Sequence, residues 1–405
     1  MSSLAEVIEV DVAATSTVCT EYSALPDAPP ARPRPVALHL LDTTMFWNPA
    51  GGVRRYVVAK QRWLAAHADW RCSVATPTPD FAATLRVPSL PLPGSGGAYR
   101  LPWRRSASAR VLRGARPDLL EAADPYLLAW ATLDAARALR VPAVAFCHSN
   151  LEQLARMTAG RYARAAAMRA ARRYTVRLYR HFDLVLAPSR AMLAHLQAWG
   201  VEHAVHQPLG VDTAAFCPER RDMSWRASLG LPDDARLLVY AGRFAPEKHL
   251  ATLVEATRRL GAPHWLLAIG AGPAPPRGER VRVLAPVRDP AALARALASS
   301  DLFVHAGDQE TFGLSALEAM ACGLPVVARD AEGLAELVDA SFGRKVASNE
   351  PEDFADAIAD LTSRDSAPLR ESARARAIAN DWQRVLPGLS QSYCGLVASA
   401  AAGRR

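Results

Sequence analysis

A strand, a glycine-containing loop and a short helix follow one another between residues 301 and 328, and this unit constrains the fold more than any other segment. The apolar run 301–306 predicts a buried strand. Apolar residues then recur at helical spacing from Leu314 onward, until Gly323 and Pro325 end the helix and a second apolar run begins. A strand that leads through a helix into another strand is typical of a parallel α/β sheet.

Two glutamates flank the loop of this unit. Glu310 follows the predicted strand, and Glu318 lies within the predicted helix. Because eight residues at roughly 100° each end about 80° beyond whole turns, the two carboxylates are expected to face one ligand. The free N–H groups near Gly313 and Leu314, at the helix start, are expected to bind an anion such as a diphosphate. An ordinary amphipathic helix with one exposed and one capping glutamate is the alternative interpretation.

A second predicted strand, 237–241, ends in a segment that carries two cations. Gly242 lets the chain turn sharply after this strand. Arg243 and Lys248 follow, and cations at a strand end suit a diphosphate leaving group, because they neutralise the charge that builds up on it. Lysine is scarce in this chain, since only three of the 48 basic residues are lysines. A surface ion pair of Glu247 with either cation is the alternative.

These segments resemble the retaining glycosyltransferases of family 4, which have the GT-B fold. Glu310 and Glu318 match the family's two glutamates separated by seven residues, and 242–248 matches its Gly-Arg-x-x-x-Glu-Lys motif. His249 departs from the pattern, because the family usually has glycine there. The resemblance implies an α/β protein of GT-B type, in which two Rossmann-like doubly wound domains face a central cleft.

The resemblance also implies roles for individual residues. Glu310 would lie beside the donor sugar as a catalytic residue, and Glu318 would bond the ribose hydroxyls of the nucleotide. Arg243 and Lys248, together with the amides of the helix start, would hold the diphosphate of the donor. No Asp-x-Asp metal motif occurs in the relevant place, so we expect the two cations to act in place of a divalent metal, with no cofactor.

Two features of the first half of the chain match the family as well. Gly51 and Gly52 follow the predicted first strand 36–41, and glycines allow a backbone to approach donor phosphates or an acceptor closely. His148 follows a predicted strand at 143–146, at the edge where open α/β sheets bind ligands. A neutral imidazole there is expected to bond a sugar hydroxyl of the donor in a catalytic role. A capping or packed histidine is the alternative.

The sequence divides into four predicted segments. They are a disordered Pro/Ala/Ser-rich tail at 1–34, an acceptor-side Rossmann-like domain at 35–213, a Rossmann-like domain for the nucleotide-sugar at 214–378, and a helix at 379–405 that returns to the first domain.

Positive charge is concentrated in the first half. Residues 1–215 hold 25 basic and 16 acidic side chains, whereas the remainder holds 23 and 24. Much of the charge falls in 100–116 and in 156–180, and the second of these stretches is alanine-rich and helical in pattern. We expect it to contact anionic lipid head groups or an anionic acceptor, with a solvated helix face as the alternative. Nucleic-acid binding is not predicted, because aromatic residues are few and no nucleic-acid motif occurs.

No run of 18 apolar residues and no secretory signal pattern occurs in the sequence. The six cysteines are scattered without a C-x-x-C pair, which indicates reduced thiols and no metal site. These features predict a cytoplasmic protein, or one held peripherally at the inner face of the membrane.

The sequence therefore predicts a retaining hexosyltransferase that moves a mannose- or glucose-type sugar from a nucleotide-diphospho-sugar to a glycolipid or polysaccharide acceptor. Overall likeness to bacterial mannosyltransferases of the family favours a GDP-sugar slightly over a UDP-sugar. A GT-B nucleotide-sugar epimerase would need a different acid/base set from the two spaced glutamates. An inactive nucleotide-sugar-binding protein would not need the intact set of two acids and two bases.

Overall fold

The computed structural model describes four stretches of the chain: 37–47, 51–78, 84–91 and 100–403. All four belong to one compact unit. The predicted disordered tail 1–34 lies outside the described residues, and so do the last two residues of the predicted segment 379–405.

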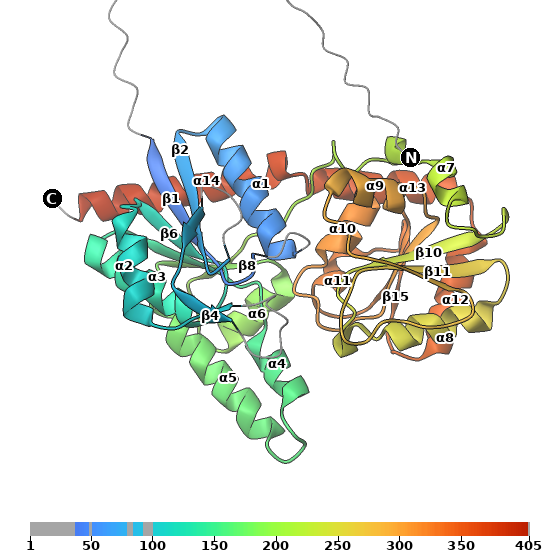
Figure 1. The fold of residues 1–405 in the computed structure, drawn as a ribbon, viewed down its shortest axis with the longest axis horizontal. Coiled ribbons are helices and arrows are strands. Elements are labelled where there is room, and N and C mark those ends of the chain that lie inside the picture. The colour runs from blue at the N-terminus through green and yellow to red at the C-terminus, as the bar shows by residue number, and fades with distance from the viewer. Residues whose placement is uncertain (1–36, 48–50, 79–83, 92–99, 404–405) are drawn as a thin grey trace, which may run out of the picture. The chain divides into compact units, whose positions relative to one another are not determined.

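The first half of the chain forms a parallel sheet of seven strands in the order β3-β2-β1-β6-β7-β8-β9 (Figure 1). Its strands are β1 (Leu38–Thr43), β2 (Trp70–Thr76), β3 (Thr84–Arg86), β6 (Leu119–Ala122), β7 (Ala143–Phe146), β8 (Leu184–Ala187) and β9 (Ala204–His206). The order of the strands reverses at β1, which has β2 on one side and β6 on the other. In open parallel sheets, the carboxyl ends at such a reversal border the ligand crevice.

Six helices accompany this sheet among the described residues, and a small antiparallel hairpin lies beside them. The helices are α1 (Gly52–His67), α2 (Arg105–Gly114), α3 (Leu127–Leu139), α4 (Leu151–Thr158), α5 (Arg164–Tyr179) and α6 (Arg190–Ala198), and the hairpin joins β4 (Ser89–Pro91) to β5 (Arg100–Pro102).

The basic stretch 156–180 was predicted as one helix, and this prediction is wrong. The structure divides it between α4, which ends at Thr158, and α5, which begins at Arg164. Gly160 lies in the turn between them, where its low helix propensity favours a break. In Figure 1 α4 and α5 lie side by side as a helical hairpin.

The second half forms a parallel sheet of six strands in the order β12-β11-β10-β13-β14-β15. Its strands are β10 (Arg236–Ala241), β11 (His264–Ile269), β12 (Val281–Leu284), β13 (Leu302–His305), β14 (Val326–Arg329) and β15 (Gly343–Val346). The central strands β10 and β13 are almost wholly apolar and buried, as expected for strands covered by helices on both faces. Here the strand order reverses at β10, between β11 and β13.

Helices also accompany the second sheet. They are α7 (Met223–Ala227), α8 (Leu250–Leu260), α9 (Pro290–Ala298), α10 (Leu314–Ala321), α11 (Glu332–Leu337), α12 (Pro351–Thr362) and α13 (Ser366–Ala379). The two parallel sheets with their helices confirm the predicted α/β class.

The last helix, α14 (Trp382–Ala402), contacts elements of the first sheet. The Trp63 indole N–H on α1 donates to Gln383 at 2.8 Å, and the Tyr393 hydroxyl donates to Glu121 on β6. A side chain at Gly210 would lie within 2.6 Å of the Trp382 ring, so only glycine lets the chain pass beneath this helix.

Candidate functional site

Glu310 lies in the loop that joins β13 to α10, at the carboxyl edge of the second sheet. Two glycines let this loop fit against its neighbours. Gly313 has φ +97° and a Cβ there would lie 2.7 Å from the Leu334 side chain, while a Cβ on Gly333 would lie 2.5 Å from the Phe312 backbone. The Gly333 N–H also donates to the Glu310 carbonyl at 2.9 Å. The position of Glu310 is therefore fixed by close packing of two backbone segments.

The Glu310 carboxylate accepts hydrogen bonds from Lys248 and from His305. The Gly307 N–H donates to His305 Nδ1 at 3.1 Å, so the ring proton is on Nε2, which lies 3.2 Å from Glu310 Oε1. Burial acts to raise the pKa of Glu310, but the charge of Lys248 and the contact with His305 outweigh it and hold this pKa well below its usual range. The carboxylate is ionised, and its side chain stays 22% exposed.

Lys248 and Arg243 come from the loop after β10, next to Glu310 because β10 and β13 are neighbours. They do not share a partner in this structure. Arg243 is 68% exposed and pairs with Glu247 at 2.7 Å, which is the surface ion pair considered as the alternative above. The Arg243 side of this pair faces solvent, whereas the Glu247 side chain is 10% exposed. A pair with its cation at the surface contributes about 0–1 kcal/mol, so the guanidinium can leave it for a ligand at small cost.

Glu318 is 2% exposed on α10, and its two carboxylate oxygens have different surroundings. Oε1 accepts a hydrogen bond from Arg55 of α1, so this contact joins the two halves of the chain. Oε2 is buried and has no hydrogen-bond partner among the described residues. A buried carboxylate oxygen without a partner is costly, and this one is free to accept a ligand hydroxyl.

Two helix starts lie next to each other in this region. Gly52 is the first residue of α1 and Leu314 is the first residue of α10. A Cβ on Gly52 would be in ordinary contact, 3.6 Å, with the Leu314 side chain. Gly51 and Gly313 occupy the N-cap positions, so neither N-cap residue has a side chain that could cap its helix. The free N–H groups and the positive dipole ends of two helices therefore adjoin one region.

His148 follows β7, and its backbone carbonyl accepts a hydrogen bond from Thr311, which is next to Glu310, at 3.2 Å. Its ring stacks on Phe146 with centroids 4.1 Å apart, and Nε2 is buried with no hydrogen-bond partner in the described part of the chain. Burial, and then the charge of Lys60, lower the pKa of His148 to about 3. The imidazole is therefore neutral at pH 7.

A buried ionic cluster that was not anticipated from the sequence lies near His148. Lys60 on α1 donates to Asp42 at 2.5 Å and to Glu121 at 2.7 Å, and none of these three side chains is exposed. The Tyr56 and Tyr393 hydroxyls also donate to Glu121. Desolvation and then the negative charge of Glu121 raise the pKa of Asp42 to about 6 against the opposing charge of Lys60.

Sequence reasoning missed Arg55 and His305 as members of the site. A signal for Arg55 was present, because it stands three residues after the Gly-Gly pair. A signal for His305 was present too, because it is a polar residue at the end of an otherwise apolar buried strand.

Comparison with known proteins shows the family of the chain. Residues 50–215 match the family model described as Glycosyltransferase Family 4, and 235–364 match the model described as Glycosyl transferases group 1. A GDP-mannose-dependent alpha-(1-6)-phosphatidylinositol dimannoside mannosyltransferase of Mycobacterium tuberculosis is 32% identical over 332 residues, which are 79% of this chain and 84% of that protein. A GDP-mannose-dependent alpha-mannosyltransferase of Mycolicibacterium smegmatis is 37% identical over 231 residues, which are 56% of this chain and 60% of that protein.

Solved structures show the same fold. Sucrose-phosphate synthase from Thermosynechococcus elongatus has a TM-score of 0.74 at 23% identity, covering 89% of this chain and 100% of that one. Anabaena Alr3699/HepE in complex with UDP and glucose has a TM-score of 0.71 at 20% identity, covering 87% and 98%.

The two doubly wound parallel sheets and these structural similarities show the GT-B fold, as predicted. The chain belongs to glycosyltransferase family 4.

Proposed function

We propose that this protein transfers mannose from GDP-mannose, with retention of configuration, to a glycolipid or glycan acceptor. The observation that carries the proposal is the ionised Glu310, fixed between Lys248 and His305 at the strand-order reversal of the second sheet. The dependence of both similar mannosyltransferases on GDP-mannose supports the choice of donor. The phosphatidylinositol dimannoside in the name of the Mycobacterium tuberculosis relative supports a glycolipid acceptor.

In this proposal, the diphosphate of the donor binds where the starts of α1 and α10 adjoin. The backbone at Gly51 and Gly52 and the amides of Gly313 and Leu314 supply hydrogen-bond donors. Lys248 and Arg243 supply the positive charge. Negative charge accumulates on the diphosphate as the sugar departs, and oriented N–H groups and cations placed in advance stabilise that charge. No divalent metal is needed in this scheme, because the cations neutralise the leaving group.

Glu318 binds the ribose hydroxyls of the nucleotide through Oε2, the carboxylate oxygen that lacks a partner among the described residues. Arg55 bonds the other oxygen, and this contact orients the carboxylate. The site discriminates against nucleotides that lack these hydroxyls, because such a donor would leave the buried carboxylate oxygen without a hydrogen bond.

Glu310 faces the sugar ring and stabilises the positive charge that develops on it as the bond to the diphosphate breaks. Lys248 and His305 orient this carboxylate. His148 has a neutral imidazole whose Nε2 lacks a partner within the described stretches, and it offers this nitrogen to a sugar hydroxyl. Each of these groups therefore has one task, and the retained configuration follows from the family to which the chain belongs.

We further propose a peripheral contact with an anionic membrane through the α4–α5 hairpin. Tyr162 in the turn of the hairpin is 86% exposed, and Leu154 and Met157 on α4 are exposed as well. The arginines that accompany them are all exposed: Arg161, Arg164, Arg169, Arg172, Arg173, Arg177 and Arg180. Exposed aromatic and apolar side chains among cations suit the interface of an anionic bilayer. No helix in the described part of the chain is long and apolar enough to span a membrane.

A donor panel tests the transferase proposal. The purified protein is incubated with GDP-mannose, UDP-glucose or other nucleotide-sugars and a bacterial lipid extract, and products are followed by mass spectrometry. We expect release of GDP together with a lipid product heavier by one hexose. Release of UDP with a hexosylated product would replace the donor, whereas conversion of the nucleotide-sugar to an epimer without transfer would overturn the proposal.

A further inference from the structure

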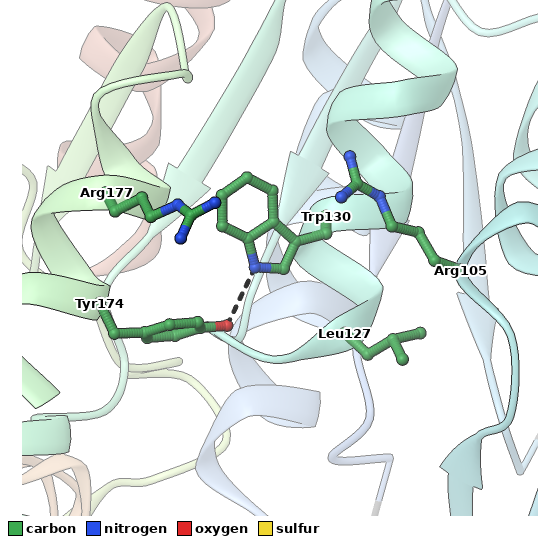
Figure 2. Close-up of a pocket in the computed structure, with 5 residues that line it drawn as sticks. All are labelled: Arg105, Leu127, Trp130, Tyr174 and Arg177. Carbon is green, nitrogen blue, oxygen red and sulfur yellow. Dashed lines mark hydrogen bonds between the residues drawn. The ribbon is translucent and has the colours of Figure 1, made fainter. Parts of the chain in front are cut away.

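A cavity of about 420 Å³ lies in the first half of the chain, between α2, α3 and α5 (Figure 2). Its lining residues are Arg105, Leu127, Trp130, Tyr174 and Arg177. None of them contributes to the donor site described above, whose acids and cations follow β10 and β13 of the second sheet. This volume falls within the range of small-molecule pockets, roughly 300–1,000 Å³.

Hydrogen bonds hold one wall of this cavity in place. The Trp130 indole N–H donates to the Tyr174 hydroxyl at 3.1 Å, and that hydroxyl donates to the Pro125 carbonyl at 2.8 Å. Figure 2 shows the indole between the Arg105 and Arg177 side chains, with Tyr174 and Leu127 below it in this view. Because its N–H is already satisfied, the indole offers a ligand only a fixed apolar surface.

The charge around the cavity is strongly positive. Arg105 lies 5.2 Å from the Trp130 ring centroid and donates to Asp134 at 2.5 Å. Arg177 is exposed and has no ion pair or hydrogen bond among the described residues. The centroid of the His181 ring lies 5.8 Å from that of Trp130, and the pKa of His181 responds to the positive charge in this region. Its pKa is lowered by desolvation and by the positive charges of four arginines: Arg137, Arg180, Arg177 and Arg105.

We propose that this cavity is a second ligand site, which takes a phosphate ester of a polyol, either as the head group of a phospholipid or as a free sugar phosphate. A guanidinium binds two phosphate oxygens at once, and Arg177 is available to do so. The face of the indole carries partial negative charge, and it packs against the weakly positive C–H groups of the polyol. A phosphate alone would fill only a small part of the cavity. In the ester, the phosphate lies at Arg177 and the polyol fills the apolar part.

Binding measurements on two matched arginine variants test this site. Arg177→Ala removes the available guanidinium of the cavity, and Arg384→Ala removes an exposed guanidinium on α14, outside the α4–α5 hairpin, with the same change in net charge. Calorimetric titration with glycerol 3-phosphate at low ionic strength measures the free ester. Co-sedimentation with phosphatidylglycerol-containing vesicles, compared with phosphatidylcholine vesicles, measures the head group. Thermal melting followed by circular dichroism confirms that both variants are folded.

We expect Arg177→Ala to weaken binding by about tenfold or more, and Arg384→Ala to weaken it much less. Selective loss in the calorimetric arm identifies a free phosphate ester as the ligand, and selective loss only with vesicles identifies a lipid head group. Equal effects of the two substitutions in both arms would overturn the proposal, because they indicate diffuse surface charge. Absence of binding by the wild-type protein in both arms would overturn it too. Hydrolysis and transfer of the donor sugar are measured separately, so failure here leaves the transferase proposal intact.

Discussion

Two of the three lysines of this chain are buried against carboxylates, one in each half, and the two clusters differ in how completely they are closed. Lys60 donates to Asp42 and Glu121, and none of the three side chains is exposed. Lys248 donates to Glu310, and these two side chains are 10% and 22% exposed. A buried lysine–carboxylate pair thus occurs once with every side chain fully enclosed, and once with side chains that solvent partly reaches.

The difference separates a structural role from a role in binding. In the Lys60 cluster, two tyrosine hydroxyls also donate to Glu121, and one of them comes from α14. Removing one partner from such a cluster leaves a buried charge uncompensated. In the Lys248 cluster, exposure lets a ligand replace the partner that is withdrawn. The third lysine, Lys345, is 40% exposed and pairs with Asp330, so it is a natural control for both.

The largest expected effect is on stability and concerns Lys60. Lys60→Ala leaves two enclosed carboxylates without their cation, and we expect it to lower the free energy of unfolding by about 3–5 kcal/mol. Lys248→Ala is expected to cost less, because solvent reaches Glu310, and Lys345→Ala is expected to cost about 1 kcal/mol or less. Urea unfolding of the three variants provides the measurement. Equal losses for Lys60→Ala and Lys345→Ala would remove the distinction between the clusters.

The next effect concerns turnover and is expected only in the second cluster. Glu310→Gln keeps the size of the side chain but removes the charge that faces the sugar ring, and we expect kcat to fall on the order of 10²–10³-fold. Lys248→Ala is expected to lower turnover strongly as well, since the diphosphate loses a cation. Transfer of mannose under saturating donor is measured alongside the melting temperature.

The control for this prediction is Asp339→Asn, which changes the charge of an exposed carboxylate that accepts hydrogen bonds from the hydroxyl and the N–H of Ser341, just after α11. Wild-type turnover in both Glu310→Gln and Lys248→Ala, with the proteins folded, would show that the reaction takes place elsewhere.

A smaller effect is expected at Glu318, where one carboxylate oxygen is bonded and the other has no partner in the described residues. Glu318→Gln weakens the proposed bond to the ribose, so KM for the donor should rise by about tenfold, with a smaller change in kcat. Arg55→Ala should raise KM in the same direction, because it removes the group that orients Glu318. Steady-state kinetics with varied GDP-mannose separates the two parameters. A fall in kcat without a change in KM would assign Glu318 to the chemical step instead.

The sequence predicted the parts of this arrangement that depend on local pattern. Short-range spacing predicts the apolar strands around Glu310 and from 237 onward, the glycines at the helix starts and the parallel α/β class. The contacts that distinguish the two clusters join residues far apart in the chain. Arg55 and Glu318 are 263 positions apart, and Glu121 and Tyr393 are 272 positions apart. Such pairs depend on how the helices pack, which periodicity does not specify.

The separation of Arg243 from Lys248 has a local cause that was also missed. His249 adopts a left-handed conformation with φ +47°, after a short turn at Pro246–Lys248. Lys248 is buried at the end of this turn and bonds Glu310, whereas Arg243, before the turn, stays at the surface with Glu247. The two cations were expected to act together because they are close in sequence. The backbone between them gives them different surroundings instead.

The last expected effect is a difference in pH dependence between the two clusters. The pKa of Asp42 is raised to about 6 by burial and by Glu121, so the folded protein binds a proton there more tightly than the unfolded chain does. As pH falls from about 6 to about 4, Asp42 should therefore add stability to the wild-type protein relative to Asp42→Asn.

Glu310 should act in the opposite direction, because its pKa is lowered. The stability that this carboxylate contributes is present above the pKa of the unfolded chain and is lost on acidification, so the difference between wild type and Glu310→Gln should shrink as pH falls below about 4.5. Urea unfolding of the wild type and both variants at several pH values measures the two slopes. Slopes of the same sign would mean that the two carboxylates have similar electrostatic surroundings, which contradicts a closed cluster in one half and a ligand-accessible one in the other.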